Sequence, residues 1–482
     1  MAGRLELCIG NSSNANPKYI VTMKTLDQAM CPAEDGRIDF SDPDRLPPNR
    51  SHGMVLASAV IKMAAMTIIF TTSKEYSILL GMDAGFFPGL IIGVVPVVGG
   101  LSCFFWQYVL HYLGYKRTNL LMCCCGLIGS VMYSVAGHLV SPGLALSGRM
   151  LMGMAGASNI IFNYLALTTG KNKKTWRMTH FAACINFGLA MGPMLSGIVD
   201  VIYLSIVHED GPVIFNTLSL PGWTMAFLYL LLGIGFAFIF VDIPLAEQHR
   251  FAKLMKHTDI EAPSSNKRCP EVPVLFTIGL AVLLYTTITI GICVGGTETR
   301  TAFVATGNST EAFASSGIAW SWRITTAGFY LGTAFASFSF IVVLSAQFTK
   351  RVHRFEDRHW VIIFYSAAVV FATFLYNFHL SQRASVVLWT VGLITFDSSV
   401  TLAKIHLFSM ALKIVPNRWL ATYSSLLGAM NSTGRGVGPI IATYVGDGYL
   451  DANVFAAILM CIVATNTIAF AIFFPQFKLK SA

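Results

Sequence analysis

Long apolar segments alternate with short polar stretches along most of the chain. A helix needs about 20 mostly apolar residues to cross a lipid bilayer. Twelve segments meet this requirement, and they start near Met54, Gly85, Asn119, Gly143, Met178, Trp223, Val274, Ile324, Val361, Ser385, Trp419 and Val454. The pattern therefore predicts an all-α membrane protein with twelve transmembrane helices.

The predicted helices fall into two halves of six that share a motif. Three positions of the fifth segment recur in the eleventh at a constant offset of 246 residues: Gly188 and Gly434, Gly192 and Gly438, Pro193 and Pro439. Proline removes a helical hydrogen bond and bends a helix, whereas glycine lets another helix come close. We therefore expect two pseudo-symmetric six-helix bundles, in which this motif serves packing, movement or both.

Polar segments give the expected domain boundaries. The sequence predicts a polar tail (1–53), an N-terminal six-helix bundle (54–245), a linker (246–272), a C-terminal six-helix bundle (273–475) and a second tail (476–482). Lys and Arg are concentrated in the tails, the linker and the loops expected on their side of the bilayer, which favours a multi-pass protein with both termini cytoplasmic. The net charge of +9 follows from this distribution, so no nucleic-acid partner is expected.

Composition narrows the class of protein further. Hydrophobic residues make up 54% of the chain and charged residues 12%, which is typical of a polytopic membrane protein. The three adjacent cysteines Cys123–Cys125 point to different sides of a helix and cannot close a tetrahedral metal site. The sequence contains no nucleotide-binding loop and no hydrolase or zinc-protease motif, so we expect no cofactor, no metal and no enzymatic activity.

Two glycine-rich motifs resemble those of the major facilitator superfamily of transporters. “GRMLMGMAGA”, residues 148–157, is similar to the fourth-helix motif of that family and supplies its arginine as Arg149. “GLAMGPMLSG”, residues 188–197, is similar to the fifth-helix motif. The resemblance covers residues 54–475 and implies a secondary transporter that works by alternating access. The fifth-helix motif further implies an antiporter.

The connection between the second and third predicted helices departs from the family pattern. It keeps Gly114, Lys116 and Arg117, but Gln107 and His111 stand where the family has glycine and aspartate. The resemblance implies a conformational role for the three retained residues. The missing aspartate weakens the case for the family's charged gate at this connection.

Some details resemble the eukaryotic lysosomal and vacuolar branch of the family. They are “FFW” before that connection, the Gly-Pro pair of the fifth helix and “GRGVGP” in the eleventh. That branch includes the ceroid-lipofuscinosis transporter-like proteins and the vacuolar phosphate transporters. The resemblance implies an endolysosomal or vacuolar membrane rather than the plasma membrane. The sequon at Asn308, in a loop expected to be lumenal, is the expected glycosylation site.

Polar residues inside the predicted helices indicate the substrate. Charges at bilayer depth are costly and usually functional, and in this family the first, fourth, seventh and tenth helices line the central cavity. The candidate substrate-binding residues are Lys62, Arg149, Asp397, Lys404, Asn163, Tyr285 and Thr289. The seventh segment, “VLFTIGLAVLLYTTITIGIC”, has no charge. Cations therefore dominate, and we expect a small organic or inorganic anion as the substrate.

We expect different roles for the charged candidates. Lys62 lies too deep to reach the interface easily. Asp397 lies near the same depth, where it either neutralises a lysine or arginine or serves as the carrier of a coupling proton. Lys404 is near enough to the cytoplasmic end of its helix to snorkel there instead. Arg435 is interpreted as a pin between helices first and as a gate second. An anion channel, which the same glycines and cations would serve, and a non-transporting receptor or scaffold stay open as alternatives.

Overall fold

The computed structural model describes residues 46–474 except 84, 158, 170, 207–214, 243–277, 307–319, 353–354, 377, 379, 415–416 and 446–451. The expected linker, the sequon at Asn308, the C-terminal tail and most of the N-terminal tail lie outside the described residues. Every described element of regular structure is a helix.

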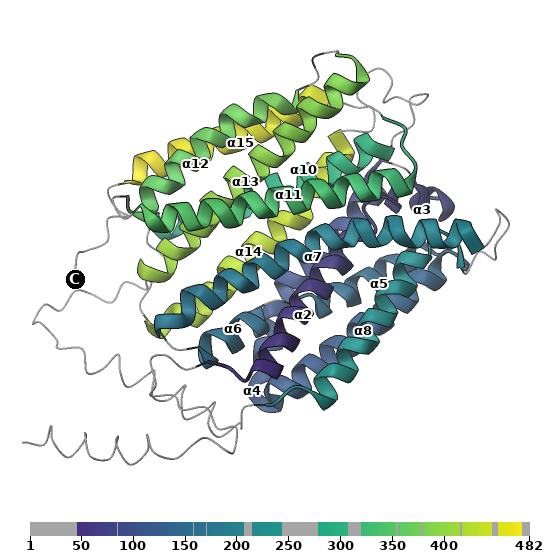
Figure 1. The fold of residues 1–482 in the computed structure, drawn as a ribbon, viewed down its shortest axis with the longest axis horizontal. Coiled ribbons are helices and arrows are strands. Elements are labelled where there is room, and N and C mark those ends of the chain that lie inside the picture. Colours follow the sequence, from purple (N-terminus) through teal and green to yellow (C-terminus); the bar gives the residue numbers. More distant parts are fainter. Residues whose placement is uncertain are drawn as a thin grey trace, which may run out of the picture.

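The helices of the two halves lie on opposite sides of the molecule (Figure 1). The first half contains α2 (Asn49–Thr67), α3 (Ser73–Leu79), α4 (Phe86–Ala136), α5 (Pro142–Ala155), α6 (Asn159–Thr168), α7 (Lys171–Ile206) and α8 (Leu220–Phe238). The second half contains α10 (Ile278–Thr306), α11 (Ile324–Arg351), α12 (Asp357–Ala372), a 3-10 turn (Thr373–Leu375), α13 (Gln382–Ile414), α14 (Asn417–Tyr444) and α15 (Ala452–Phe473).

Local sequence signals account for several helix ends. α5 begins where the side chain of Ser141 accepts a hydrogen bond from the Leu144 N–H at 3.3 Å, with Pro142 in the first turn. The backbone leaves helical geometry at Gly114 (φ 76°, ψ 176°), which divides the 51 residues of α4 into two arms. A positive φ of this kind favours glycine, because glycine has no Cβ. The second and third predicted segments thus meet at this residue without an intervening loop.

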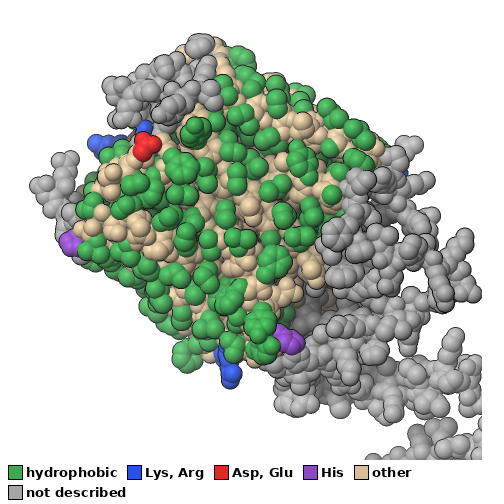
Figure 2. Space-filling view, turned by 180° about the vertical axis from the view of Figure 1, so that it is seen from behind, with side chains coloured by type: hydrophobic (Ala, Val, Ile, Leu, Met, Phe, Trp, Pro, Cys, Tyr) green, Lys and Arg blue, Asp and Glu red, His purple; other side chains and the backbone are tan. Residues whose placement is uncertain are grey.

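Eight helices in the described residues are long and apolar enough to cross a membrane. They are Phe86–Ala136, His180–Ile206, Leu220–Phe238, Gly279–Thr306, Ile324–Thr349, Asp357–Leu375, Gln382–Ala411 and Asn453–Phe473. Figure 2 shows apolar side chains spread over one face of the molecule, with charged side chains at its margins. The exposed apolar residues include Phe238 at 85% and Phe340 at 65%. Such a surface suits contact with lipid rather than water.

Two expectations about element boundaries are wrong. α2 begins at Asn49, inside the stretch expected to be tail. α10 continues to Thr306, past the quoted charge-free segment, and contains Glu298 and Arg300. The apolar run ends at Cys293, but the helix continues because charged side chains can remain in a membrane helix when they are buried against other helices. Both Glu298 and Arg300 are buried, at 0% and 1% exposure.

The two halves meet along two pairs of helices. The first arm of α4 packs along α14, and α7 packs against α11. Glycines stand at both contacts: a Cβ on Gly100 would lie 2.9 Å from the Ala429 carbonyl oxygen, and a Cβ on Gly328 would lie 2.6 Å from the Pro193 carbonyl oxygen. Small residues permit this close approach of backbones between membrane helices. Asp200 of α7 also accepts a hydrogen bond from Thr325 of α11.

Candidate functional site

The repeated Gly-Pro motifs occupy equivalent places in two pairs of helices. α7 packs on α2, and α14 packs on α10. The carbonyl oxygens that lie under the motif glycines have a second constant offset, of 228 residues: Val60 and Ile288 under Gly188 and Gly434, Ala64 and Ile292 under Gly192 and Gly438. The internal repeat therefore relates whole contacting helix pairs and not only one motif.

Each motif proline leaves one carbonyl without its helical donor. Pro193 frees the carbonyl of Leu189, and the hydroxyl of Thr67 on α2 donates to that oxygen at 3.1 Å. The second proline frees the carbonyl of Arg435. The residue equivalent to Thr67 there, 228 positions on, is Gly295, whose backbone lies so close to the Arg435 oxygen that a Cβ would overlap it. The two bends are thus held differently, by a side-chain hydrogen bond in the first half and by backbone contact in the second.

Arg149 is fully buried where α5 meets α2 and α4. Its Nη1 donates to the Ala65 carbonyl at 3.0 Å, its Nη2 to the Met66 carbonyl at 3.2 Å and its Nε to the Ile91 carbonyl at 3.2 Å. The first two carbonyls belong to the last turn of α2, before the turn that leads into α3. A cation is favourable at a helix C-terminus. In this conformation, backbone carbonyls occupy all three nitrogens of the guanidinium group.

Lys62 is buried near the C-terminal end of α2 and has no acidic partner among the described residues. Its side chain is 5% exposed, and its Nζ lies 3.8 Å from Sδ of Met122 on the second arm of α4. Among the described residues, no carboxylate lies within ion-pair distance of this ammonium group. A thioether is a weak acceptor, so the charge is poorly compensated.

Glu298 and Arg435 form a buried ion pair between α10 and α14. Nη2 of Arg435 lies 2.6 Å from Oε1 and 2.7 Å from Oε2 of Glu298. The Glu298 side chain is 1% exposed and the Arg435 side chain 11%. This contact is of the kind expected for a pin between helices. It also shows that the seventh helix of the predicted series contributes a charge to the interior.

Asp397 and Lys404 lie beside that ion pair on α13. Asp397 is fully buried, and its Oδ1 accepts a hydrogen bond from Thr297 of α10 at 2.7 Å. Its Oδ2 has no hydrogen-bond partner in the described part of the chain. Lys404 is partly buried and interacts electrostatically with Arg435, Glu298 and Asp397. The four charged groups therefore form one cluster inside the second half.

The uncharged candidates are placed in three different ways. Thr289 faces α15, where its hydroxyl contacts the Asn466 side chain at 2.9–3.0 Å. Tyr285, one turn earlier on α10, is 47% exposed. Asn163 is half-buried on α6. The structure does not bring these three residues together with the charged cluster of the second half.

The Gly114 connection contains a carboxylate that the motif comparison did not indicate. The Lys116 N–H, at the start of the second arm of α4, donates to Oδ2 of Asp242 at 3.3 Å. Asp242 follows α8, so it comes from elsewhere in the sequence. A carboxylate is favourable at a helix N-terminus. Arg117 is exposed beside it.

The substituted position Gln107 joins the two halves. Its Oε1 accepts a hydrogen bond from the Ser425 hydroxyl of α14 at 3.3 Å. This contact extends the pairing of α4 with α14 toward the Gly114 connection. Gln107, which replaces the glycine of the family pattern, therefore makes a neutral hydrogen bond to the other half.

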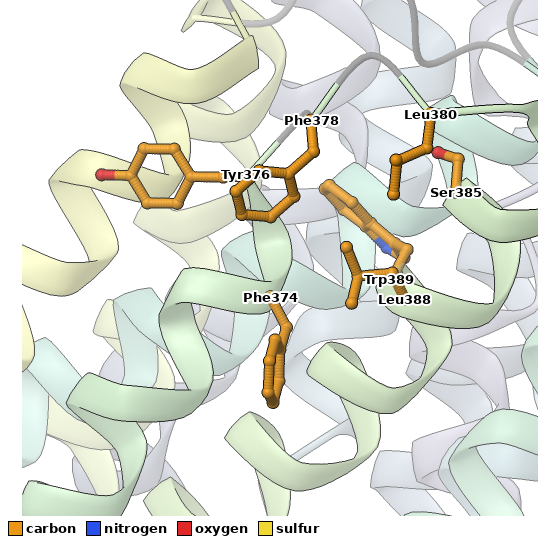
Figure 3. Close-up of a pocket in the computed structure, with 7 residues that line it drawn as sticks. All are labelled: Phe374, Tyr376, Phe378, Leu380, Ser385, Leu388 and Trp389. Atoms are coloured by element: carbon orange, nitrogen blue, oxygen red, sulfur yellow. The ribbon is translucent and has the colours of Figure 1, made fainter.

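A small pocket lies where α12 turns into α13 (Figure 3). It is lined mainly by apolar side chains: Phe374, Tyr376, Phe378, Leu380, Ser385, Leu388 and Trp389. Its volume of about 10 Å³ would hold no more than one water molecule. Trp389 is buried and donates to the hydroxyl of Thr301 at 3.0 Å. This pocket contains none of the charged residues described above, so it is not the substrate site proposed below.

The sequence motifs did not indicate Glu298, Thr67 or Asp242. A usable signal existed for the first, because α10 carries glycines at 291 and 295, the spacing that lets a second helix pack closely. That spacing would have extended the seventh segment past Cys293 and included Glu298. Thr67 and Asp242 have no such signal, since their partners lie 122 and 126 residues away.

Sequence relatives and solved structures both relate the chain to membrane transport proteins. No protein-family model matches the chain. An uncharacterized MFS-type transporter of Schizosaccharomyces pombe is 29% identical over 214 residues, which is 42% of this chain and 41% of the relative. An SPX domain-containing membrane protein of Arabidopsis thaliana is 26% identical over 219 residues, 45% of this chain and 29% of the relative. The chain therefore matches less than half the length of these curated relatives.

Solved structures match over most of the chain. The nucleoside transporter NupG has a TM-score of 0.58 and 16% identity, and the match covers 90% of this chain and all of the other. The human organic anion transporter TETRAN has a TM-score of 0.58 and 14% identity, over 88% of this chain and all of the other. A D-xylose-proton symporter has a TM-score of 0.63 and 11% identity, over 90% and 99%. The chain is a multi-pass membrane protein with the fold of these transporters, and its sequence relatives include MFS-type transporters rather than enzymes.

Proposed function

We propose that the protein is a secondary transporter of a small anion that works by alternating access. The observation that carries this proposal is Lys62, a buried ammonium group with no carboxylate within ion-pair distance among the described residues. An uncompensated charge at bilayer depth is costly and persists where function requires it. A substrate anion would supply the missing charge. One structural neighbour is named an organic anion transporter, so the fold is compatible with such cargo.

The charges of the two halves also favour an anionic substrate. The second half contains two carboxylates, Glu298 and Asp397, close to the cations Arg435 and Lys404. In the first half, Lys62 and Arg149 are buried cations. Arg149 is occupied by carbonyls in this conformation, so we assign it to holding α2 against α4 and α5. That leaves Lys62 as the proposed anion ligand of the first half and Lys404 as that of the second.

Transport into liposomes tests this proposal. The purified chain is reconstituted, and uptake of radiolabelled phosphate, sulfate, succinate and lactate is measured. We expect saturable uptake and counterflow of at least one anion, with the half-saturating concentration raised tenfold or more in Lys62→Gln. Uptake that does not saturate would indicate a channel. No uptake of any anion by well-folded protein would refute the proposal and favour a receptor or scaffold.

The membrane topology is part of the proposal. Twelve spans result if α2 with α3, both arms of α4, α5 with α6, and α14 each cross once in addition to the other long helices. The asymmetry of Lys and Arg then places both termini in the cytoplasm. The assignment of the protein to an endolysosomal or vacuolar membrane rests on the resemblance of the sequence motifs alone. Colocalisation of a tagged chain with lysosomal and plasma-membrane markers tests it.

The Gly-Pro motifs and the Gly114 connection are the proposed moving parts. Pro193 and Pro439 bend equivalent helices, α7 and α14, and both helices pack across the contact between the halves. Lys116, Arg117 and the Gln107–Ser425 hydrogen bond would form the cytoplasmic end of that contact. Rocking of one half against the other would open the cavity alternately to each side.

A further inference from the structure

We propose that the first half binds a phosphate group near the start of α2, at a site formed by His52, Arg177 and His180. This site is separate from the proposed transport residues, because His52 comes ten residues before Lys62, about 15 Å along α2. The inference therefore goes beyond the proposed transport function and does not depend on it. In the proposed topology the site lies at the cytoplasmic face, where a soluble compound or a lipid headgroup can supply the phosphate.

His52 is a buried polar side chain without a partner among the described residues. It is 6% exposed, and neither Nδ1 nor Nε2 of its ring makes a hydrogen bond within the described part of the chain. A neutral imidazole has one donor and one acceptor, and a protonated one has two donors. Burying such groups unpaired costs free energy. A histidine at this position therefore indicates a polar ligand for its ring.

The packing of α7 on α2 brings two more basic side chains to that ring. The α2 carbonyls that lie under Gly188 and Gly192 both come 128 residues before them, so the two helices run side by side in the same direction. Eight residues earlier, the same offset puts His180 level with His52. Arg177 is 11 residues before Gly188, which is about three turns, and is therefore on the face of α7 that packs on α2. Both basic groups are close enough to act on the charge of His52.

The start of α2 adds backbone donors to the same place. The first N–H groups of a helix have no acceptor within it. α2 follows Pro48, without a side-chain cap and without an acidic residue in its first turn. Helical side chains tilt toward the N-terminus of their helix, so the ring of His52, the fourth residue of α2, is directed back over this turn. Helix N-termini favour phosphate groups.

A phosphate group matches this set of donors. The guanidinium group of Arg177, which is 7% exposed, can hold two phosphate oxygens at once. The rings of His52 and His180 can each donate to another oxygen, and the first turn of α2 supplies N–H groups. A carboxylate near this end of α2, Asp242, already accepts the Lys116 N–H at 3.3 Å. The arrangement can thus bind all the oxygens of one phosphate group from two helices.

Thermal unfolding in a Lys62→Gln background tests binding without the proposed transport site. Inorganic phosphate and glycerol phosphate are added to protein in neutral detergent, with chloride at equal ionic strength as the reference. Phosphatidylcholine nanodiscs with and without phosphatidic acid form the second arm. We expect a higher melting temperature in at least one arm. A rise with the soluble compounds assigns a soluble ligand, and a rise with phosphatidic acid alone assigns a lipid headgroup.

Absence of a rise in both arms would overturn the inference. A rise that occurs in the wild type but not in Lys62→Gln would overturn it too, because phosphate would then bind at the proposed transport site. The proposed transport function would be supported by that result. Conversely, failure of anion uptake in liposomes would leave binding near the start of α2 unaffected.

Three variants locate the ligand. In His52→Leu and in Arg177→Gln the half-saturating amount of phosphate or phosphatidic acid should rise at least tenfold. Without ligand, His52→Leu should melt no lower than its parent, because it removes an unpaired buried polar group. Arg50→Gln is the matched control, since it removes an exposed charge two residues away, and it should keep its affinity. Unchanged affinity in His52→Leu, or an equal loss in Arg50→Gln, would show that general surface charge causes the response and would overturn the proposed site.

Discussion

The hydroxyl of Thr67 donates a hydrogen bond to the carbonyl oxygen of Leu189, 3.1 Å away on the neighbouring helix. This carbonyl is the one that Pro193, four residues later, leaves without a helical donor. The bend in α7 is therefore completed by a side chain of α2. In the second half, the equivalent residue is Gly295, which has no side chain to donate.

Thr67→Val should lower stability because it keeps the shape of the side chain and removes the donor. We expect a loss of about 1–3 kcal/mol, the cost of an unsatisfied buried carbonyl, seen as a lower apparent melting temperature in detergent. Pro193→Ala restores an N–H for Leu189, so Thr67→Val should cost much less in that background. Purely additive effects of the two substitutions would show that the hydrogen bond does not stabilise the bend.

Glu298→Gln should destabilise the second half strongly. It leaves Arg435 as a buried cation without its partner, a change that typically costs about 3–5 kcal/mol. Thermal unfolding in detergent measures the loss. The double variant Glu298→Leu with Arg435→Met removes both charges and should recover most of that stability. If Glu298→Gln melts like the wild type, the ion pair does not hold α10 to α14.

Arg149→Ala should reduce folding and transport together. Three carbonyls, those of Ala65, Met66 and Ile91, lose their donor, which we expect to cost about 3 kcal/mol or more. Arg149→Lys should recover little, since an ammonium group cannot reach three separated oxygens as a planar guanidinium does. Melting temperature and uptake are compared in the same preparations. Lost transport at an unchanged melting temperature would instead place Arg149 at the substrate.

Gly438→Ala should disturb the packing of α14 on α10. The added Cβ would lie 2.5 Å from the backbone nitrogen of Gly296 and from the Ile292 carbonyl oxygen, so helices must shift, at a typical cost of about 1–3 kcal/mol. Gly428→Ala on the same helix meets nothing within 4 Å and should be neutral or stabilising. Equal melting temperatures for the two variants would contradict close packing at Gly438. If Gly438→Ala folds but transports more slowly at unchanged affinity, the motif also serves movement.

Asn308 should be the glycosylated sequon of the chain. Glycosylation requires exposure to the lumen. The proposed topology puts Asn308 there, whereas Asn49, which begins another sequon (Asn49-Arg50-Ser51), lies in the cytoplasm. Gel mobility before and after glycosidase treatment is compared for the wild type, Asn308→Gln and Asn49→Gln. We expect the shift to disappear only with Asn308→Gln. A shift abolished by Asn49→Gln would reverse the orientation.

The sequence by itself determined the kind of molecule. In a bilayer, the backbone hydrogen-bonding groups of apolar segments of about 20 residues are satisfied only within helices. The 246-residue offset of the Gly-Pro motifs revealed the internal repeat. The chain also showed several of the charges that lie inside helices, but not Asp200 of α7 or Glu298 of α10. These features are local or periodic, so they can be recognised from the sequence without knowing which helices are neighbours in space.

Only the tertiary structure decided what each buried group contacts. Thr67 meets Leu189, Glu298 meets Arg435 and Arg149 meets carbonyls of two other helices, across separations from 58 to 137 residues. A partner in another helix depends on the rotation and depth of both helices, which neither segment encodes alone. The same holds for Lys62, because the helices packed around it decide whether a carboxylate lies beside it, and none of the described residues supplies one.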